Sequence, residues 1–236
     1  MVEYLQTFLN QLKRGWQGSL VKVSDAEKID ANAKQYMNRL ARSSEIERVT
    51  WGWYWVPDKY RDFFDFLQKD KHFKVIHKQT AASYWNGDFI HRDTYSLAVP
   101  DKSYGKALSQ FAESRGWHVA VEFRKLRKGQ YQEADGLYVE SLEDTIVDCV
   151  KDWAFADAFA SLHENKDRVD WQRIFKHSWE RISGSDTRVG QVVKYGTGII
   201  GRESGTTAYA ETRTVIPDNF VRRQVEEAAE KVVEFA

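Results

Sequence analysis

The sequence predicts an α+β protein, and three features of its pattern support that prediction. Residues 1–57 contain three short helical patterns followed by two short strand patterns. Beyond residue 60, helical and strand-like segments alternate, which is typical of a mixed α/β or α+β domain. The last part begins with a stretch rich in Gly, Ser and Thr and ends in a helical pattern. We therefore expect three parts: residues 1–59, residues 60–183, and a Gly-rich loop with a C-terminal helical segment over residues 184–236.

The first two helices are predicted from apolar spacing and from a capping pattern. Val2–Arg14 carries apolar residues at i, i+3 and i+4 spacing, as in an amphipathic helix. Ser24 and Glu27 stand three residues apart and match a capping box, in which each side chain accepts the other's backbone N–H. We therefore expect a short second helix over about Asp25–Ile29.

A third helix is predicted over about Ala31–Arg42, after the N-cap candidate Asp30. Its apolar residues form one stripe: Ala33, Tyr36, Met37 and Leu40. Its polar and basic residues fall on the other side: Lys34, Gln35, Asn38, Arg39 and Arg42. Such a helix buries its apolar stripe and presents the basic side to solvent or to a ligand.

An aromatic run, Trp51-Gly-Trp-Tyr-Trp55, follows in a predicted β-hairpin. The strands would be Ile46–Val49 and Trp53–Val56, with Gly52 supplying the positive φ of a tight turn. Pro57 ends the second strand because it has no N–H for the ladder. Alternation places Trp53 and Trp55 on one face, Tyr54 and Val56 on the other, and Trp51 at the tip. Three helices followed by this hairpin predict an N-terminal winged helix-turn-helix.

The region after residue 60 is predicted as a mixed α/β domain. Helices are expected at about residues 60–67, 80–85, 104–114, 141–160 and 169–182, and strands at about 74–77, 94–99, 117–123 and 136–139. Ser141 and Asp144 form a capping box that would open the long helix at residue 141. A final helix is expected over 217–235.

Composition limits the classes of function. Acidic and basic residues balance at 35 each, which excludes a uniformly basic nucleic-acid coat but not a local basic face. No apolar run reaches the length of about 18 residues that a membrane span needs, and no signal peptide is visible. The single cysteine, Cys149, lies in an apolar pattern and is expected in the core. These features predict a cytoplasmic protein with no membrane partner.

Three segments resemble the AbiEi-type antitoxins, the regulator half of type IV toxin–antitoxin pairs. They are Glu47–Pro57, which is similar to the family's hairpin, and Val75–Gly87 and Gly136–Asp148, which are similar to two of its later segments. The resemblance covers about residues 1–174. It implies a DNA-binding winged helix followed by an α/β domain without catalytic activity or cofactor. It also implies a regulator of its own operon that opposes a nucleotidyltransferase-type toxin.

The expected partner is double-stranded DNA, with a cognate toxin as a second partner. Gln and Asn side chains pair with adenine edges, Arg with guanine, and Lys or Arg with phosphates. The candidate DNA contacts are Lys34, Gln35, Asn38, Arg39 and Arg42 on the third helix, with Arg48 and Trp51 on the hairpin. The alternative for the helix is an ordinary solvated face. The alternative for Trp51 is a partly exposed residue that covers the hairpin.

Two other classes of function stay open beside the regulator. A protein-interaction module would use the hairpin tryptophans and the second domain to bind a partner protein. A nuclease would need an acid and a Lys on one face of a strand, whereas Glu122 and Lys125 are separated by two residues. The six His residues show no tight metal-ligand spacing and no CxxC motif is present, so the sequence predicts no metal site.

Overall fold

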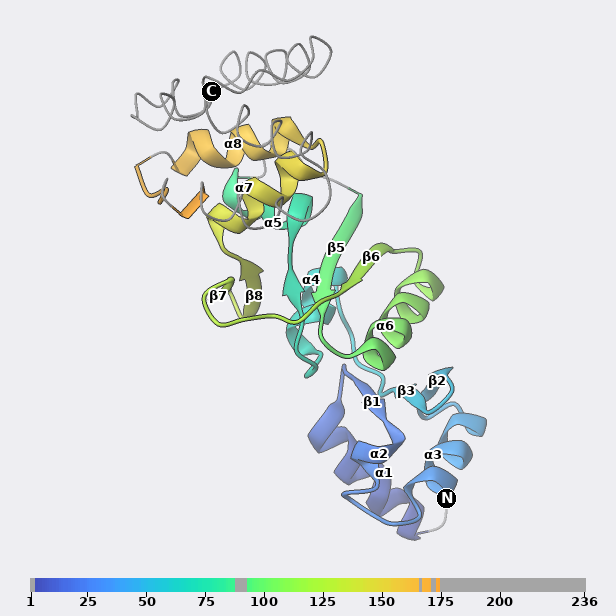
Figure 1. Cartoon of the computed structure of the whole chain (residues 1–236). Coiled ribbons are helices and arrows are strands. Elements are labelled where there is room, and N and C mark those ends of the chain that lie inside the picture. The colour runs from blue at the N-terminus through green and yellow to red at the C-terminus, as the bar shows by residue number, and fades with distance from the viewer. Residues whose placement is uncertain (1–2, 88–92, 166, 171–172, 175–236) are drawn as a thin grey trace. The chain divides into compact units, whose positions relative to one another are not determined.

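The computed structural model describes residues 3–87, 93–165, 167–170 and 173–174. Over these residues the protein has a mixed α+β fold with eight helices and two sheets (Figure 1). The expected Gly-rich loop 184–205 and the helix at 217–235 lie outside the described residues, as does most of the helix expected at 169–182. No helix among the described residues is both long enough and apolar enough to cross a bilayer.

The chain divides into two compact units. The first comprises Met1–Lys74, Ala98–Lys125 and Asp135–Leu137. The second comprises Val75–Leu97, Leu126–Ala134 and the described residues from Tyr138 onward. Each unit is therefore built from several chain segments, and the boundary expected after residue 59 lies inside the first unit.

The first unit begins with three helices and a small sheet. The elements are α1 (Glu3–Trp16), β1 (Leu20–Lys22), α2 (Val23–Ala26), α3 (Ala33–Arg42), β2 (Glu47–Thr50) and β3 (Trp53–Trp55). Both strand pairs are antiparallel, and the order is β1-β3-β2. The helices pack on one face of this sheet around a buried core: Leu5, Phe8, Leu9, Leu12, Val21, Ala26, Ala33, Met37, Leu40, Ile46, Tyr54 and Val56.

The second helix begins earlier than the capping box predicts. The residue before it is Lys22, and no side chain caps it, so the capping box expected at Ser24 is wrong. The physical reason is the strand β1, which the sequence did not indicate because it has only three residues. Val23 N–H donates to the Gly52 carbonyl at 2.9 Å. This hydrogen bond to the hairpin fixes the backbone at Val23, the first residue of α2. Asp30 accepts from Asn32 N–H at 2.7 Å in the turn before α3.

Both faces of β3 are buried, which explains the density of aromatic residues. Tyr54 belongs to the helical core described above. On the opposite face, Trp53 is 2% exposed and its indole N–H donates to Ser103 Oγ at 2.8 Å. Trp55 packs against Phe111 with ring centroids 5.4 Å apart. The sheet is therefore a middle layer, with α6 (Lys102–Ser114) of the same unit beyond it.

A buried carboxylate links several elements of the first unit. Asp70, which follows α4 (Phe63–Lys69), accepts hydrogen bonds from Ser19 Oγ, Leu20 N–H and Tyr104 O–H at 3.0, 2.9 and 2.7 Å. Lys74 Nζ lies 3.0 Å from Asp70 Oδ2. The Asp70 carboxylate thus accepts hydrogen bonds from the start of β1 and from α6, and it also pairs with the buried Lys74 ammonium.

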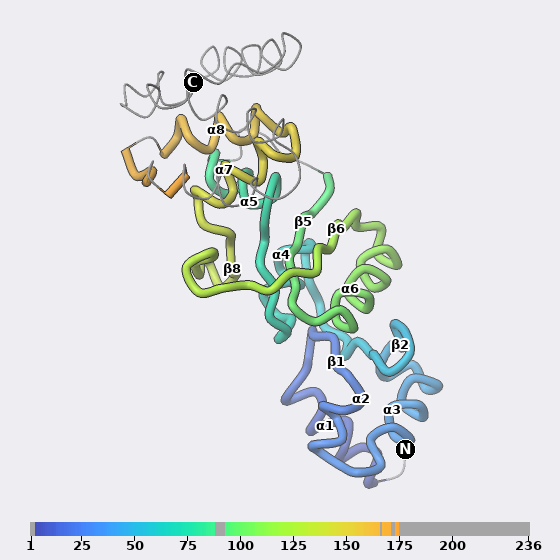
Figure 2. The backbone as a smooth tube through the Cα atoms, viewed as in Figure 1, coloured from blue at the N-terminus to red at the C-terminus, as the bar shows by residue number. Residues whose placement is uncertain are grey.

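The second sheet contains strands from later in the chain. They are β4 (Val75–Ile76), β5 (Thr94–Val99), β6 (His118–Phe123), β7 (Tyr131–Ala134) and β8 (Leu137–Glu140), in the order β6-β5-β4-β8-β7. The pair β4–β8 is parallel, with Ile76 beside Val139. The strand β7 was not predicted. The path of the chain through α6 and β6, which lie side by side, can be followed in Figure 2.

Three helices pack together in the second unit: α5 (Lys78–Trp85), α7 (Leu142–Lys151) and α8 (Phe155–Asn165). Ser141 caps α7 by accepting Asp144 N–H, as the sequence predicts. The single long helix expected over 141–160 is wrong, because the chain breaks at Trp153, whose φ is 63°. Ala154 N–H donates back to the Cys149 carbonyl at 2.8 Å, and α8 starts in a new direction.

Candidate functional site

The outer side of α3 is polar and carries no acidic residue. Lys34, Gln35, Arg39 and Arg42 are exposed there, while Met37 and its apolar neighbours are buried on the inner side. The sequence therefore places the two sides of this helix correctly. The helix carries three cationic side chains to solvent within ten residues, a surface suited to an anionic partner.

Asn38 differs from the other candidates on α3 because its amide is engaged at both ends. Its Nδ2 donates to the Lys34 carbonyl at 2.8 Å, and its Oδ1 accepts from the Tyr54 hydroxyl at 2.8 Å. Burial raises the pKa of that Tyr54 hydroxyl, against a smaller lowering effect of Arg48. Asn38 thus ties α3 to β3, and a contact to a base would require these hydrogen bonds to be exchanged.

Arg39 has a partner within the protein but keeps donors for a ligand. Its Nη1 donates to the Tyr4 hydroxyl at 2.7 Å, which orients the guanidinium over α1. A guanidinium carries five N–H donors, so this single bond leaves capacity for a phosphate or a base edge.

The hairpin tip presents an aromatic ring and a cation together. Trp51 is 79% exposed, and Gly52 beside it has φ 75°, as the turn predicts. The Arg48 guanidinium lies 5.4 Å from the centroid of the Trp51 ring, within cation–π range. The ladder between β2 and β3 shifts register between Arg48 and Thr50. The tip thus presents an exposed Trp ring with an Arg guanidinium over it.

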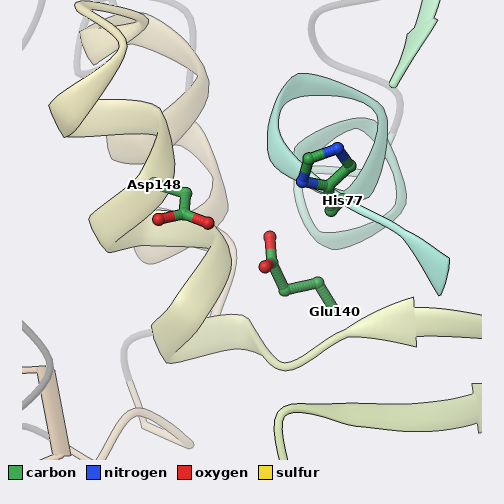
Figure 3. Close-up of side chains that lie close together, drawn as sticks. All are labelled: His77, Glu140 and Asp148. Atoms are coloured by element: carbon green, nitrogen blue, oxygen red, sulfur yellow. The ribbon is translucent and has the colours of Figure 1, made fainter. Parts of the chain in front are cut away.

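A second group of side chains of metal-ligating types is buried in the second unit. His77, Glu140 and Asp148 each offer one ligand atom, and these three atoms lie within 4.8 Å of one another (Figure 3). The residues are 1%, 0% and 5% exposed. Sequence spacing missed this cluster because its members come from three elements. The feature that brings them together is the pairing of β4 with β8. No local sequence motif predicts this pairing.

The neighbouring Cys149 is a free cysteine that is fully buried. Burial, and then the carboxylates of Asp157, Glu140 and Asp148, hold its pKa well above the ordinary value. The thiol therefore stays protonated near neutral pH, which fits the core position expected from the sequence.

The two residues considered for a nuclease differ in burial and in their position relative to β6. Glu122 lies in β6 and is half-buried, whereas Lys125 lies beyond the end of that strand and is exposed. Of the candidate residues considered from the sequence, those on α3 and at the hairpin tip are mostly exposed, and all of them lie in the first unit.

No protein-family model matches the chain, and no curated protein matches it. The fold and the site define it as an α+β protein with an exposed basic helix next to a small antiparallel sheet.

Proposed function

We propose that the protein is a DNA-binding transcriptional regulator and that α3 is its recognition helix. The observation that carries this proposal is the exposed side of α3, which has Lys34, Arg39 and Arg42 and no acidic residue. In helix-turn-helix proteins the second helix of the motif lies in the major groove, with phosphate contacts around it. Here α2 and α3 would form that motif.

The arrangement of the first elements supports a winged helix. The order α1-β1-α2-α3-β2-β3, with the antiparallel sheet ordered β1-β3-β2, is the order expected of that fold. The hairpin β2–β3 would then be the wing. Its Arg48 would contact phosphate, and the Trp51 ring would pack against sugar or base edges of the adjacent groove.

Among the α3 residues, we assign different roles. Lys34, Arg39 and Arg42 would neutralise phosphates or, for the two Arg, pair with guanine. Gln35 is the candidate for reading adenine, because its amide is exposed, whereas the Asn38 amide is engaged by Tyr54 and Lys34. The resemblance to AbiEi-type antitoxins supports a site upstream of the protein's own gene as the operator. It also supports a nucleotidyltransferase-type toxin as the second partner.

The test is a binding titration of the full chain with labelled DNA from upstream of its own gene, followed by anisotropy at several salt concentrations. We expect log K to fall with log salt, with a slope of about −0.9 per phosphate neutralised. Lys34→Ala and Arg42→Ala should each reduce the slope by about one. The matched control is Lys106→Ala, an exposed Lys on α6 of the same unit. Equal effects of all three changes, or a slope near zero, would reject α3 as the DNA-binding element.

A protein-binding role is the second candidate, and the exposure of Trp51 favours it. Large exposed aromatic residues are enriched at protein interfaces. If the hairpin tip binds a protein partner, Trp51→Ala should leave the affinity and the salt slope for DNA unchanged and abolish co-purification with the product of the adjacent gene. If the tip is a wing, the same variant should weaken DNA binding.

A further inference from the structure

Three elements of the second unit bring His77, Glu140 and Asp148 together. His77 follows β4, Glu140 is the last residue of β8, and Asp148 lies in α7. Figure 3 shows the two carboxylates facing one another from the strand end and the helix, with the imidazole ring beside Glu140. All three side chains are more than nine-tenths buried.

The pairing of the strands explains this convergence. In the parallel pair β4–β8, Ile76 lies beside Val139, so the next residues, His77 and Glu140, leave the same edge of the sheet side by side. The carboxyl ends of parallel strands are where α/β sheets form their ligand sites. The helix α7 begins two residues after β8 and carries Asp148 back over this edge.

Hydrogen bonds hold the cluster in place. Glu140 Oε2 accepts the Lys78 backbone N–H at 3.0 Å, and the Trp85 indole N–H donates to the Glu140 carbonyl at 3.0 Å. The His77 backbone N–H donates to the Ser96 carbonyl at 3.1 Å. Both the backbone and one carboxylate oxygen of Glu140 are therefore oriented before any ligand binds, as a preorganised site requires.

The side chains of the cluster are of the types that bind divalent cations. Two carboxylates and an imidazole converge from three elements, with one ligand atom of each within 4.8 Å of the others, in a buried setting. Buried carboxylates that lie close together repel one another, and a positive charge held among them offsets that repulsion. A divalent cation bound by all three side chains would supply such a charge.

We propose that His77, Glu140 and Asp148 bind a divalent first-row transition metal ion, with Zn²⁺ and Mn²⁺ as the ions that fit best. Imidazole nitrogen together with carboxylate oxygen is a ligand set for these ions, whereas Ca²⁺ and Mg²⁺ take oxygen ligands. Ligands about 2.1 Å from one ion lie roughly 3 to 3.6 Å apart. The observed limit of 4.8 Å thus needs only a small inward movement of the side chains.

The burial of the site gives the ion a structural role. The ion would hold the ends of β4 and β8 against α7. The ligands on these elements lie apart in the sequence and meet only in the folded protein. This inference does not depend on DNA binding, because every residue that it uses lies in the second unit.

The test uses the full chain, freed of metal by dialysis against a chelator. Calorimetric titration with Zn²⁺ and electron paramagnetic resonance with Mn²⁺ should each give one site per chain. Zn²⁺ should raise the Tm by several degrees, since a ligand that binds only the folded state stabilises it. Mg²⁺ and Ca²⁺ at the same concentration should not.

Conservative variants locate the ion. Glu140→Gln, Asp148→Asn and His77→Gln should each weaken Zn²⁺ binding at least tenfold and remove the Tm shift, while the far-ultraviolet circular dichroism stays unchanged. The control variants are His163→Gln and Glu164→Gln, which change a partly exposed His–Glu pair on α8 of the same unit, whose charged atoms lie 3.8 Å apart. They should bind as the wild type does.

Two results would overturn the proposal. One is a folded wild-type chain that binds neither ion at millimolar concentration. The other is Zn²⁺ binding that the folded cluster variants leave intact. If a cluster variant fails to fold, the test rests on the wild-type chain. The proposal requires that Zn²⁺ raises the Tm of that chain and that Mg²⁺ does not.

Discussion

At the residue scale, the aromatic run of the hairpin divides into members with separate roles. Trp53 is buried and hydrogen-bonded through its indole, whereas Trp51, two residues earlier, is 79% exposed at the tip. The spacing of two in a strand would put both on one face if the chain stayed extended. The turn at Trp51-Gly52 prevents this, so one tryptophan packs in the interior and the other faces solvent.

We expect Trp53→Ala to lower the free energy of unfolding by about 3–5 kcal/mol, because truncating a buried Trp leaves a cavity. Trp51→Ala should change it by less than about 0.5 kcal/mol, as for most exposed positions. Urea unfolding followed by circular dichroism measures both. Similar losses in the two variants would show that Trp51 is packed in solution.

Asn38 provides a second test at this scale. Asn38→Ala should lower the free energy of unfolding by about 1–3 kcal/mol, because the half-buried Tyr54 hydroxyl loses its acceptor. Tyr54→Phe in the same background should cost little more, since the two groups form one hydrogen bond. The double-mutant cycle in urea measures this coupling. Additive losses would mean that the pair does not interact.

At the scale of elements, Asp70 stabilises the contact between β1 and α6. Burial alone would raise the pKa of its carboxyl, but Lys74, His72 and the hydrogen bonds from Tyr104 and Leu20 outweigh burial and hold the pKa below the ordinary value of 3.8. Burial and the same carboxylate hold the pKa of the Tyr104 hydroxyl well above its ordinary value, so the phenol stays a donor. The charged form of Asp70 is therefore the one that the folded state favours.

We expect Asp70→Asn to lower the free energy of unfolding at pH 7 by about 3–5 kcal/mol, because Lys74 is then left buried without its counter-charge. The control is Glu45→Gln, which removes a half-exposed ion pair with Lys13 and should cost less than about 1 kcal/mol. Urea unfolding of both variants gives the comparison. Equal small effects would mean that water reaches Lys74.

The same carboxylate predicts a dependence of stability on pH. A group whose pKa is lower in the folded state contributes stability that is present above the unfolded-state pKa, about 3.9 for Asp, and that is lost as pH falls through the folded-state pKa. The free energy of unfolding of the wild type should therefore fall as the pH drops below about 4. Asp70→Asn should flatten this part of the profile, and an unchanged profile would exclude Asp70 as its source.

At the scale of the whole molecule, the first unit is assembled from three chain segments. The tryptophans Trp53 and Trp55 pack against residues of α6, which is encoded more than forty positions later. Cutting the chain after residue 60 would expose both rings. Each buried ring of this size stabilises a fold by about 4 kcal/mol or more, comparable to the whole stability of a small domain.

We therefore expect a fragment of residues 1–60 to lack a cooperative thermal transition, and a fragment of residues 1–125 to show one. Circular dichroism at far- and near-ultraviolet wavelengths measures both. A cooperative transition of the shorter fragment near the Tm of the full chain would support the boundary at residue 59 that the sequence predicts.

The sequence by itself determined the local features of this protein. The apolar stripe of α3, the positive φ of Gly52 and the Ser141 cap follow from periodicity, turn chemistry and capping, which act over a few residues. The sequence therefore predicted the α+β class, most helices, the hairpin and the exposed basic side of α3. Only the tertiary structure decided which side chains from distant segments meet: Asn38 with Tyr54, Asp70 with Tyr104, and His77 with Glu140 and Asp148. Those contacts depend on strand pairing and on the packing of helices over a sheet, so no local pattern encodes them. Bringing distant residues into contact costs loop-closure entropy, and the burial of apolar surface elsewhere in the fold offsets that cost.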